Sequence, residues 1–298
     1  MGLPGDSVSP SFGKNAARDE IDIPGNNRLM GILVEDRWSL PDLATAVQWC
    51  AERNRQNIRC TLAVMAEYAQ TPEESQHSLV AHLAGIREAG SQPGISFSIK
   101  PSAIGILFDH GEYVRNLSLL FHEALDRGVP FEMDMEGRAF VADTLRSALT
   151  IAGEGGPVTL ALQAYLNRTS TDLSRCMDAG IRVRLVKGAY LGDTRDFTVI
   201  QEEFRKHAGT LISAGARFSA ATHDPVLVDW LKEEMRHHKN LVEFGFLKGL
   251  AERTKSEMAA EGWKVSEYVP YGPGGEAYVR RREQYLAALE HLGRSPLP

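Results

Sequence analysis

Short apolar segments recur along the chain and predict β-strands. Several are rich in β-branched or aromatic residues. One of them alternates, with Ile181, Val183 and Leu185 on one side and Arg182 and Arg184 on the other. The predicted strands are eight segments, at 58–65, 94–101, 130–136, 159–166, 182–190, 217–224, 241–249 and 264–272.

The stretches between these segments have the start and stop signals of helices. Thr71-Pro72-Glu73-Glu74 opens the first with a cap residue, a proline and two acids. A glycine or asparagine, the common left-handed helix stop, then stands shortly before each strand, at Gly90, Gly128, Gly153, Gly180, Gly215, Asn240 and Gly262. A last helix is predicted at about 275–292.

The alternation of strands and helices implies parallel pairing through βαβ crossovers. Eight such units predict an α/β fold, a (β/α)8 barrel of the TIM type with some distortion. A doubly wound open sheet is the alternative. We expect a mobile tail at 1–25, a helical extension at 26–57 that contains a helix within 39–57, and a catalytic barrel domain at 58–298.

Charge and cysteine content exclude several classes of partner. A net charge of -6 argues against nucleic acid, which requires a basic surface. Cys50, Cys60 and Cys176 form neither a disulfide framework nor a metal-ligand spacing, so we expect a reducing compartment and no metal. No apolar run is long enough to span a bilayer, and the N-terminus lacks a signal-peptide core. These features favour a cytoplasmic location, with peripheral contact at the inner membrane face left open.

Polar and charged residues stand near the ends of the predicted strands, and barrel enzymes carry their chemistry at the carboxyl ends. One such residue alone is best interpreted as a buried ion pair or the start of a loop. Strand ends that are polar in seven places favour a ligand site. The residues are Lys100, Asp134, Glu136, Gln163, Tyr165, Arg184, Lys187, Thr222, His223, Glu243, Tyr268 and Tyr271.

Familiar cofactor motifs do not account for this site. No G-x-G-x-x-G stands between a strand and a helix, and no Walker sequence, H-E-x-x-H or nucleophile elbow occurs. Acid–base chemistry and a flavin held by a barrel without a dinucleotide fold both stay open.

The segment "RLVKGAY" at 184–190 resembles the signature of the proline dehydrogenase family, flavoenzymes built on a (β/α)8 barrel. Other strand ends resemble motifs of the same family in the same order. The resemblance extends over roughly residues 58–290. The further matching segments are "SIKPSAIG" (98–105), "DMEG" (134–137), "LQAYL" (162–166), "ATHD" (221–224), "EFGFLKG" (243–249), "YVPYG" (268–272) and "YVRRR" (278–282).

Members of that family bind FAD over the carboxyl-end mouth of the barrel and oxidise L-proline to 1-pyrroline-5-carboxylate, the first step of proline catabolism. The resemblance implies that Arg184 lies beside the flavin N5, the hydride acceptor. It implies that Lys187 and the small pair Gly188 and Ala189 line the cofactor and let the backbone come close. The remaining implied flavin contacts are Gln163, Val186, Thr222, His223 and Leu247.

The implied substrate site combines a carboxylate clamp with a packing surface. Two guanidinium groups, Arg281 and Arg282, grip the carboxylate, while Tyr268 packs against the ring. The implied set comprises Lys100, Asp134, Arg184, Tyr268, Tyr278, Arg281 and Arg282, with Lys100 and Asp134 as an ion pair below the substrate. The alternative for the arginine run is a solvated helix face.

Two positions depart from the family pattern: Gly245 stands where glutamine is usual, and Tyr285 where an acid is usual. They leave open the oxidation of another cyclic imino acid, a flavin-free Schiff-base lyase on Lys187, and a barrel without activity. The partners implied by the main hypothesis are a quinone or other electron acceptor and a separate pyrroline-5-carboxylate dehydrogenase.

Overall fold

A computed structural model describes residues 37–291 and 293–298, and its centre is a closed barrel of eight parallel strands. Each strand pairs with its neighbours in sequence, and β1 pairs with β8 to close the ring. The strands are β1 (Ile58–Val64), β2 (Ile95–Ile99), β3 (Phe131–Met133), β4 (Val158–Gln163), β5 (Arg182–Val186), β6 (Phe218–Ala221), β7 (Val242–Leu247) and β8 (Lys264–Tyr271). The barrel prediction is confirmed, and the open-sheet alternative is wrong.

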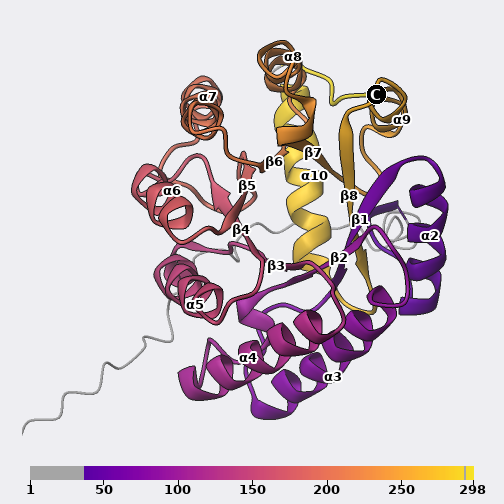
Figure 1. Ribbon diagram of the computed structural model, residues 1–298, viewed down its shortest axis with the longest axis vertical. Coiled ribbons are helices and arrows are strands. Elements are labelled where there is room, and N and C mark those ends of the chain that lie inside the picture. The colour runs from indigo at the N-terminus through magenta and orange to yellow at the C-terminus, as the bar shows by residue number, and fades with distance from the viewer. Residues whose placement is uncertain (1–36, 292) are drawn as a thin grey trace, which may run out of the picture.

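Helices surround the barrel, as Figure 1 shows. Seven of them follow strands in turn: α3 (Pro72–Ala89), α4 (His110–Asp126), α5 (Val141–Gly153), α6 (Thr169–Asp178), α7 (Phe197–Ser213), α8 (Pro225–Glu234) and α9 (Glu252–Ala260). Short 3-10 turns lie at 101–103, 138–140 and 239–241. The left-handed conformation occurs at Gly128, Gly180, Gly215 and Gly262. It does not occur at Gly90, where φ is -67°, and near Gly153 it falls on Gly155 instead.

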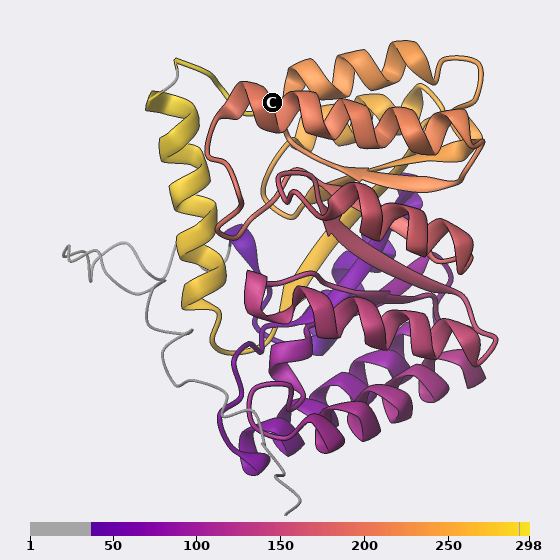
Figure 2. The same cartoon turned by 90° about the vertical axis from the view of Figure 1, so that its left-hand side faces the viewer.

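The helix after β8 leaves the ring. α10 (Glu276–His291) lies behind the strands in Figure 1 and beyond one end of the barrel in Figure 2, so it crosses the mouth where the strands end. A small apolar cluster under it holds Trp38, Met65, Leu250 and Tyr278, apart from the main core. α10 therefore covers the carboxyl-end mouth, and this position departs from the regular ring of helices in a (β/α)8 barrel.

α2 (Leu43–Arg55) fills the place that α10 leaves beside β8 and β1. Asp42 caps it by accepting from the N–H of Thr45. On its buried face Trp49 donates to Glu267 at 2.6 Å, and Arg53 lies 3.2 Å from the same carboxylate. The helix within 39–57 is confirmed. Residues 1–36, which include the predicted tail and the first part of the extension, lie outside the described residues, and the domain boundaries stay predictions.

Apart from Glu267, which faces α2, the strands carry mainly apolar side chains outward and polar ones inward. The main core under the helices contains Leu62, Phe97, Val183, Leu185 and Phe244, all buried. Because side chains alternate along a strand, the same register turns Arg182 and Arg184 into the barrel. The barrel interior is thus a polar column between two mouths. No helix of the described part of the chain is long and apolar enough to cross a membrane.

Candidate active site

A buried cluster of paired charges lies inside the barrel below the carboxyl-end mouth. Asp134, just beyond β3, accepts from the hydroxyl of Tyr268 at 2.5 Å and from the hydroxyl of Ser98 at 2.8 Å. Lys100, just beyond β2, donates to the Tyr268 oxygen at 3.0 Å and lies 3.4 Å from Asp134. The guanidinium of Arg184 binds Asp134 as well. We call Lys100, Asp134, Arg184 and Tyr268, with Glu132 described next, the floor cluster.

Glu132 on β3 completes the floor cluster. Arg184 donates to it at 2.7 Å, and the hydroxyl of Ser96 donates to it at 2.6 Å. Arg184 thus bridges two carboxylates, with its guanidinium carbon 5.6 Å from the ring centre of Tyr268. The cluster contains two cations and two carboxylates, so its formal charges balance.

Pairing fixes the charge states of the floor cluster. Burial alone would raise the pKa of Asp134, but Arg184 and Lys100 outweigh it and lower that pKa to about 2. Burial opposes the charged form of Lys100, yet Tyr268 and Asp134 together raise its pKa well above the usual range. Burial, reinforced by the charge of Asp134, raises the pKa of Tyr268. At neutral pH the floor cluster therefore holds an ammonium, a carboxylate and an uncharged phenol.

α10 brings arginines to the mouth from above. Arg281 donates to Glu67, which follows β1, at 2.5 Å, and its guanidinium carbon lies 4.6 Å from the ring centre of Tyr190. The guanidinium of Arg282 lies 4.8 Å from the ring of Tyr278. Among the described residues no carboxylate pairs with Arg282. Arg280 points outward and is exposed.

Several buried polar atoms under α10 lack a hydrogen-bond partner in the described part of the chain. They are the hydroxyls of Tyr278 and Tyr285, Nε of Arg281 and of Arg282, and one oxygen of Glu67. Buried donors and acceptors are rarely left unpaired in folded proteins. Their concentration at one mouth fits a polar ligand between the barrel and α10. The donor set suits an anionic group, which FAD and an amino-acid carboxylate both carry.

Lys187, just after β5, is already engaged within the protein. Its ammonium lies 2.8 Å from a carboxylate oxygen of Asp224 and 3.1 Å from the ring centre of Phe197. Gln201 donates to the same oxygen at 2.6 Å. Burial lowers the pKa of Lys187 to about 8, with Asp224 acting against the shift. At pH 7 the group is mostly a paired ammonium, which argues against a Schiff-base nucleophile.

Gly188 makes its close approach to Tyr165. Its φ is +128°, and a Cβ there would lie 1.6 Å from the Tyr165 ring. The Tyr165 hydroxyl accepts from the N–H of Tyr190 at 2.8 Å and lies 2.5 Å from the side-chain oxygen of Gln163. The absence of a Cβ at Gly188 is therefore required for packing against Tyr165, and its place beside the cofactor stays a prediction. Gln163 also donates to the backbone oxygen of Glu136 at 2.9 Å.

The other residues assigned to the flavin line the ends of β5, β6 and β7. Thr222 accepts from the N–H of Asp224 at 3.1 Å, and His223 accepts at Nε2 from the N–H of Leu247 at 3.0 Å. Burial lowers the pKa of His223 to about 3, with Arg282 adding to the shift, so its ring is neutral. Val186 and Leu247 are half-buried, and Ala189 is exposed.

Two residues that the sequence placed at the site lie elsewhere. Glu243 is the second residue of β7 and pairs with Arg59 at the opposite end of the barrel, 3.1 Å away. Tyr271 points outward, where its ring contacts the Gly85 position on α3. In both cases the strand bounds decide which mouth or face a side chain reaches. The sequence missed Glu67, Glu132 and Tyr190 as members of the site.

The two departures from the family pattern have local consequences. At Gly245 a Cβ would lie 3.4 Å from the Cβ of Ala221 and 3.7 Å from Oγ of Ser266, so an alanine would fit there in ordinary van der Waals contact. The ring of Tyr285 lies 6.2 Å from that of His223, and its hydroxyl is buried without a partner. In the described residues, no group of histidine, cysteine and acidic side chains could hold a metal ion.

The fold and site define a (β/α)8-barrel protein with a paired ionic floor and an arginine-bearing helix over its mouth. The sequence profile of the proline dehydrogenase family matches residues 46–284. The chain belongs to the proline dehydrogenase family.

Two curated relatives carry the same family name. The chain is 30% identical over 255 residues to proline dehydrogenase of Deinococcus radiodurans, covering 80% of this chain and 82% of that protein. It is 26% identical over 248 residues to proline dehydrogenase 1 of Bacillus subtilis strain 168, with 80% and 82% covered.

Solved structures share the fold. Proline utilization A (PutA) from Bdellovibrio bacteriovorus, inactivated by N-propargylglycine, has a TM-score of 0.77 at 18% identity. The match covers 84% of this chain and 32% of that one, so this chain spans about a third of its length. A bifunctional PutA protein matches with a TM-score of 0.70 at 22% identity, with 83% and 30% covered.

Proposed function

We propose that this chain is an FAD-dependent proline dehydrogenase that oxidises L-proline to 1-pyrroline-5-carboxylate. Membership of the family supports the reaction. The substrate assignment rests on Arg281 and Arg282 of α10. Their buried Nε atoms have no partner among the described residues. Planar guanidinium groups match a carboxylate better than any other side chain does.

The balance of charges at the mouth favours a single carboxylate. The floor cluster is neutral in sum. Above it Arg281 is paired with Glu67, and Arg282 has no carboxylate partner among the described residues, an excess of one positive charge over these three groups. A monocarboxylic amino acid neutralises that excess when it binds. Tyr268 offers a flat face for the pyrrolidine ring, and its bulk disfavours a ring hydroxyl, so proline is preferred over hydroxylated cyclic imino acids.

The residues proposed to hold the cofactor are those at the ends of β4 to β7. Gln163, Lys187 and His223 offer polar groups there, while the guanidinium of Arg184 lies deeper and is paired with Asp134 and Glu132. FAD bound there would supply a two-electron acceptor for the hydride that leaves C5, the ring carbon next to nitrogen that does not carry the carboxylate, while the nitrogen would lose its proton to solvent. Positive charge near a group that becomes more negative during reaction stabilises the product state.

The floor cluster positions the substrate and does not exchange protons with it near pH 7. Asp134 stays ionised because its pKa is about 2, and Tyr268 stays neutral because its pKa is raised. Glu136, by contrast, titrates near neutrality, because burial and the charge of Glu67 raise its pKa to about 7. Glu136 accepts from the hydroxyl of Ser102 at 2.6 Å, so it orders the turn after β2.

Electrons and product then leave the enzyme. The proposal includes a quinone or other acceptor for the electrons, with peripheral contact at the inner membrane face as one way to reach it. It also includes a separate pyrroline-5-carboxylate dehydrogenase for the product.

The first test of the proposal is the flavin itself. Purified protein is expected to carry non-covalent FAD with absorbance near 450 nm, and anaerobic L-proline should bleach it. Protein that stays colourless after incubation with FAD would count against the whole assignment.

The second test concerns the arginines on α10. Arg282→Met is the sharper variant because Arg282 has no carboxylate partner within 37–291 and 293–298, and it should weaken proline binding by about 2–5 kcal/mol, roughly 30-fold or more. Arg281→Met should weaken binding as well, with an added cost from stranding Glu67. Arg280→Met, on the exposed side, is the matched control and should change binding by less than roughly 0.5 kcal/mol. Equal proline titrations for all three variants would remove the clamp.

A further inference from the structure

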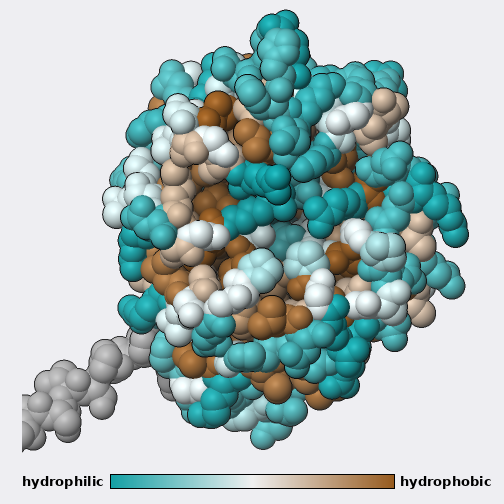
Figure 3. All heavy atoms as spheres, in the orientation of Figure 1, coloured by the Kyte–Doolittle hydropathy of each residue, from teal (hydrophilic) through white to brown (hydrophobic). Residues whose placement is uncertain are grey.

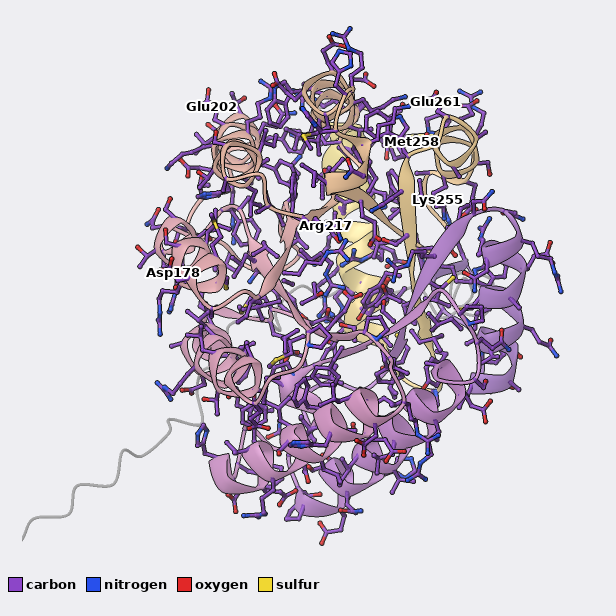
Figure 4. The ribbon with its side chains drawn as sticks, viewed as in Figure 1. Asp178, Glu202, Arg217, Lys255, Met258 and Glu261 are labelled. Carbon is purple, nitrogen blue, oxygen red and sulfur yellow. The ribbon has the colours of Figure 1, made fainter. Side chains whose placement is uncertain are left out.

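A second cavity opens at the other end of the barrel, where the strands begin. Its volume is about 380 Å³. Figures 3 and 4 look onto this face, with Arg217 near the middle of the ring of helices and hydrophilic residues gathered around it. The lining includes Arg59 on β1, Arg182 on β5, Arg217 just before β6, Glu243 on β7 and Lys264 on β8. We call this the amino-end cavity.

Positive charge in the amino-end cavity is not balanced. Four cations line it against one carboxylate, Glu243, a formal excess of three. Glu243 pairs with Arg59 at 3.1 Å and with Arg182 at 3.5 Å. Lys264 donates to the backbone oxygen of Asn240 at 2.8 Å and pairs with no carboxylate in the described part of the chain. Like charges in one place repel, and the other ionic cluster of the barrel, the floor cluster, is neutral by contrast.

Unused donors face this cavity. Nε of Arg182 is buried and has no acceptor among the described residues. Its Nη2 donates to the hydroxyl of Ser219 at 3.0 Å, so the guanidinium is held in place. Arg217 makes no hydrogen bond or ion pair with the described part of the chain and is exposed. The exposed guanidinium of Arg217 therefore has donors available to an oxyanion in the cavity.

We propose that the amino-end cavity binds a small multivalent oxyanion through Arg182, Arg217 and Lys264. The cavity lies within the usual range of roughly 300–1,000 Å³ for ligand sites and exceeds the needs of a single phosphate. A ligand with two or three acidic groups, either phosphates or carboxylates, matches both the volume and the excess of three charges. This site goes beyond the proposed oxidation of proline. Because it lies at the opposite end of the polar column, its ligand does not compete with proline.

Calorimetric titration of the FAD-saturated protein at low ionic strength tests the proposal. Inorganic pyrophosphate and citrate are the probes, and they distinguish a phosphate ligand from a carboxylate one. Excess FAD keeps any diphosphate-binding part of the flavin site filled. The expected result is saturable binding of at least one probe, which weakens as salt is added because the contacts are ionic.

Arg217→Gln locates the binding. Loss of one charged donor should weaken it by about tenfold or more. Because Arg217 is exposed and without a partner, the variant should fold, which circular dichroism checks. Arg175→Gln, an exposed arginine on α6, is the matched control and should bind like the wild type. The proposal is overturned if neither probe binds the wild type at millimolar concentration, or if both variants bind equally.

Discussion

Asp134→Asn tests whether the floor cluster holds the barrel together as well as the substrate. Asparagine keeps the shape of the side chain but removes its charge. Lys100 would then lose its nearest carboxylate, while Arg184 would keep only Glu132. Removing one partner of a buried ion pair leaves a buried charge without compensation, which typically costs about 3–5 kcal/mol.

The lowered pKa of Asp134 gives a second measure of this cost. The pKa falls from 3.8 to about 2 in the folded state. Each pH unit of such a difference is worth about 1.4 kcal/mol, so the ionised form contributes about 2–3 kcal/mol near neutrality. Since the native pKa is depressed, this contribution is fully present above about pH 4 and is lost as the pH falls toward 2.

Urea unfolding at pH 7 measures the effect. We expect Asp134→Asn to lower the free energy of unfolding by roughly 2–4 kcal/mol. Asp143→Asn is the control, because Asp143 pairs with the exposed Arg146 on the surface of α5 at 2.6 Å, and it should cost less than about 1 kcal/mol. A loss for Asp134→Asn as small as that of the control would refute the reasoning, since the floor cluster would then not be desolvated.

Two further predictions concern packing and pH. Gly188→Ala should destabilise the fold by roughly 1–3 kcal/mol or more, because its φ is +128° and a Cβ would meet the Tyr165 ring. Gly209→Ala, within α7, should instead stabilise the fold by about 0.5–1 kcal/mol, because nothing lies within 4 Å of a Cβ there. Thermal melts measure both variants, and a lowered melting temperature for both would contradict this reasoning. Burial lowers the pKa of His223 in the folded state to about 3. The unfolded state therefore binds a proton below about pH 6.5 that the folded state does not, and stability falls as the pH falls. His223→Gln should make this loss of stability smaller between pH 4.5 and 6.5. Glu136 has the opposite effect, because its raised pKa of about 7 makes stability fall as the pH rises from 4.5 to 7. Glu136→Gln should therefore make the loss of stability in acid steeper. If stability depends on pH with the same slope in both variants, neither pKa shift is correct.

The pattern of the sequence was sufficient for the barrel because alternation and helix stops are local signals. The inward direction of the β5 cations followed from the same alternation. Because Val183 and Leu185 point outward, Arg182 and Arg184 must point into the barrel. Glu132 could have been found in that way, because it lies on the same face of its strand as Asp134. The wrong placement of Glu243 had a different cause: the strand was predicted at 241–249, and a residue near its beginning was taken for one at its carboxyl end.

Other parts of the site have no local signal at all. Glu67 is an isolated acid after β1, and its partner Arg281 lies 214 positions later on α10. That contact depends on α10 crossing the mouth. Because α10 crosses the mouth, the place of the eighth helix beside β8 and β1 is left to α2. The sequence of neither helix indicates this exchange by itself.

The closure of the barrel has a consequence for the way the chain is made. β1 pairs with β8 from Ile58–Val265 to Val64–Tyr271, and the buried face of α2 contacts Glu267. The ribosome synthesises α2 and β1 early and their partner β8 near the end of the chain. At about 5–20 residues per second, the roughly 200 residues between α2 and β8 take some ten to forty seconds to synthesise. During that interval the nascent chain exposes an open strand edge and an unpaired helix face, so it needs shielding from its neighbours until the last strand arrives.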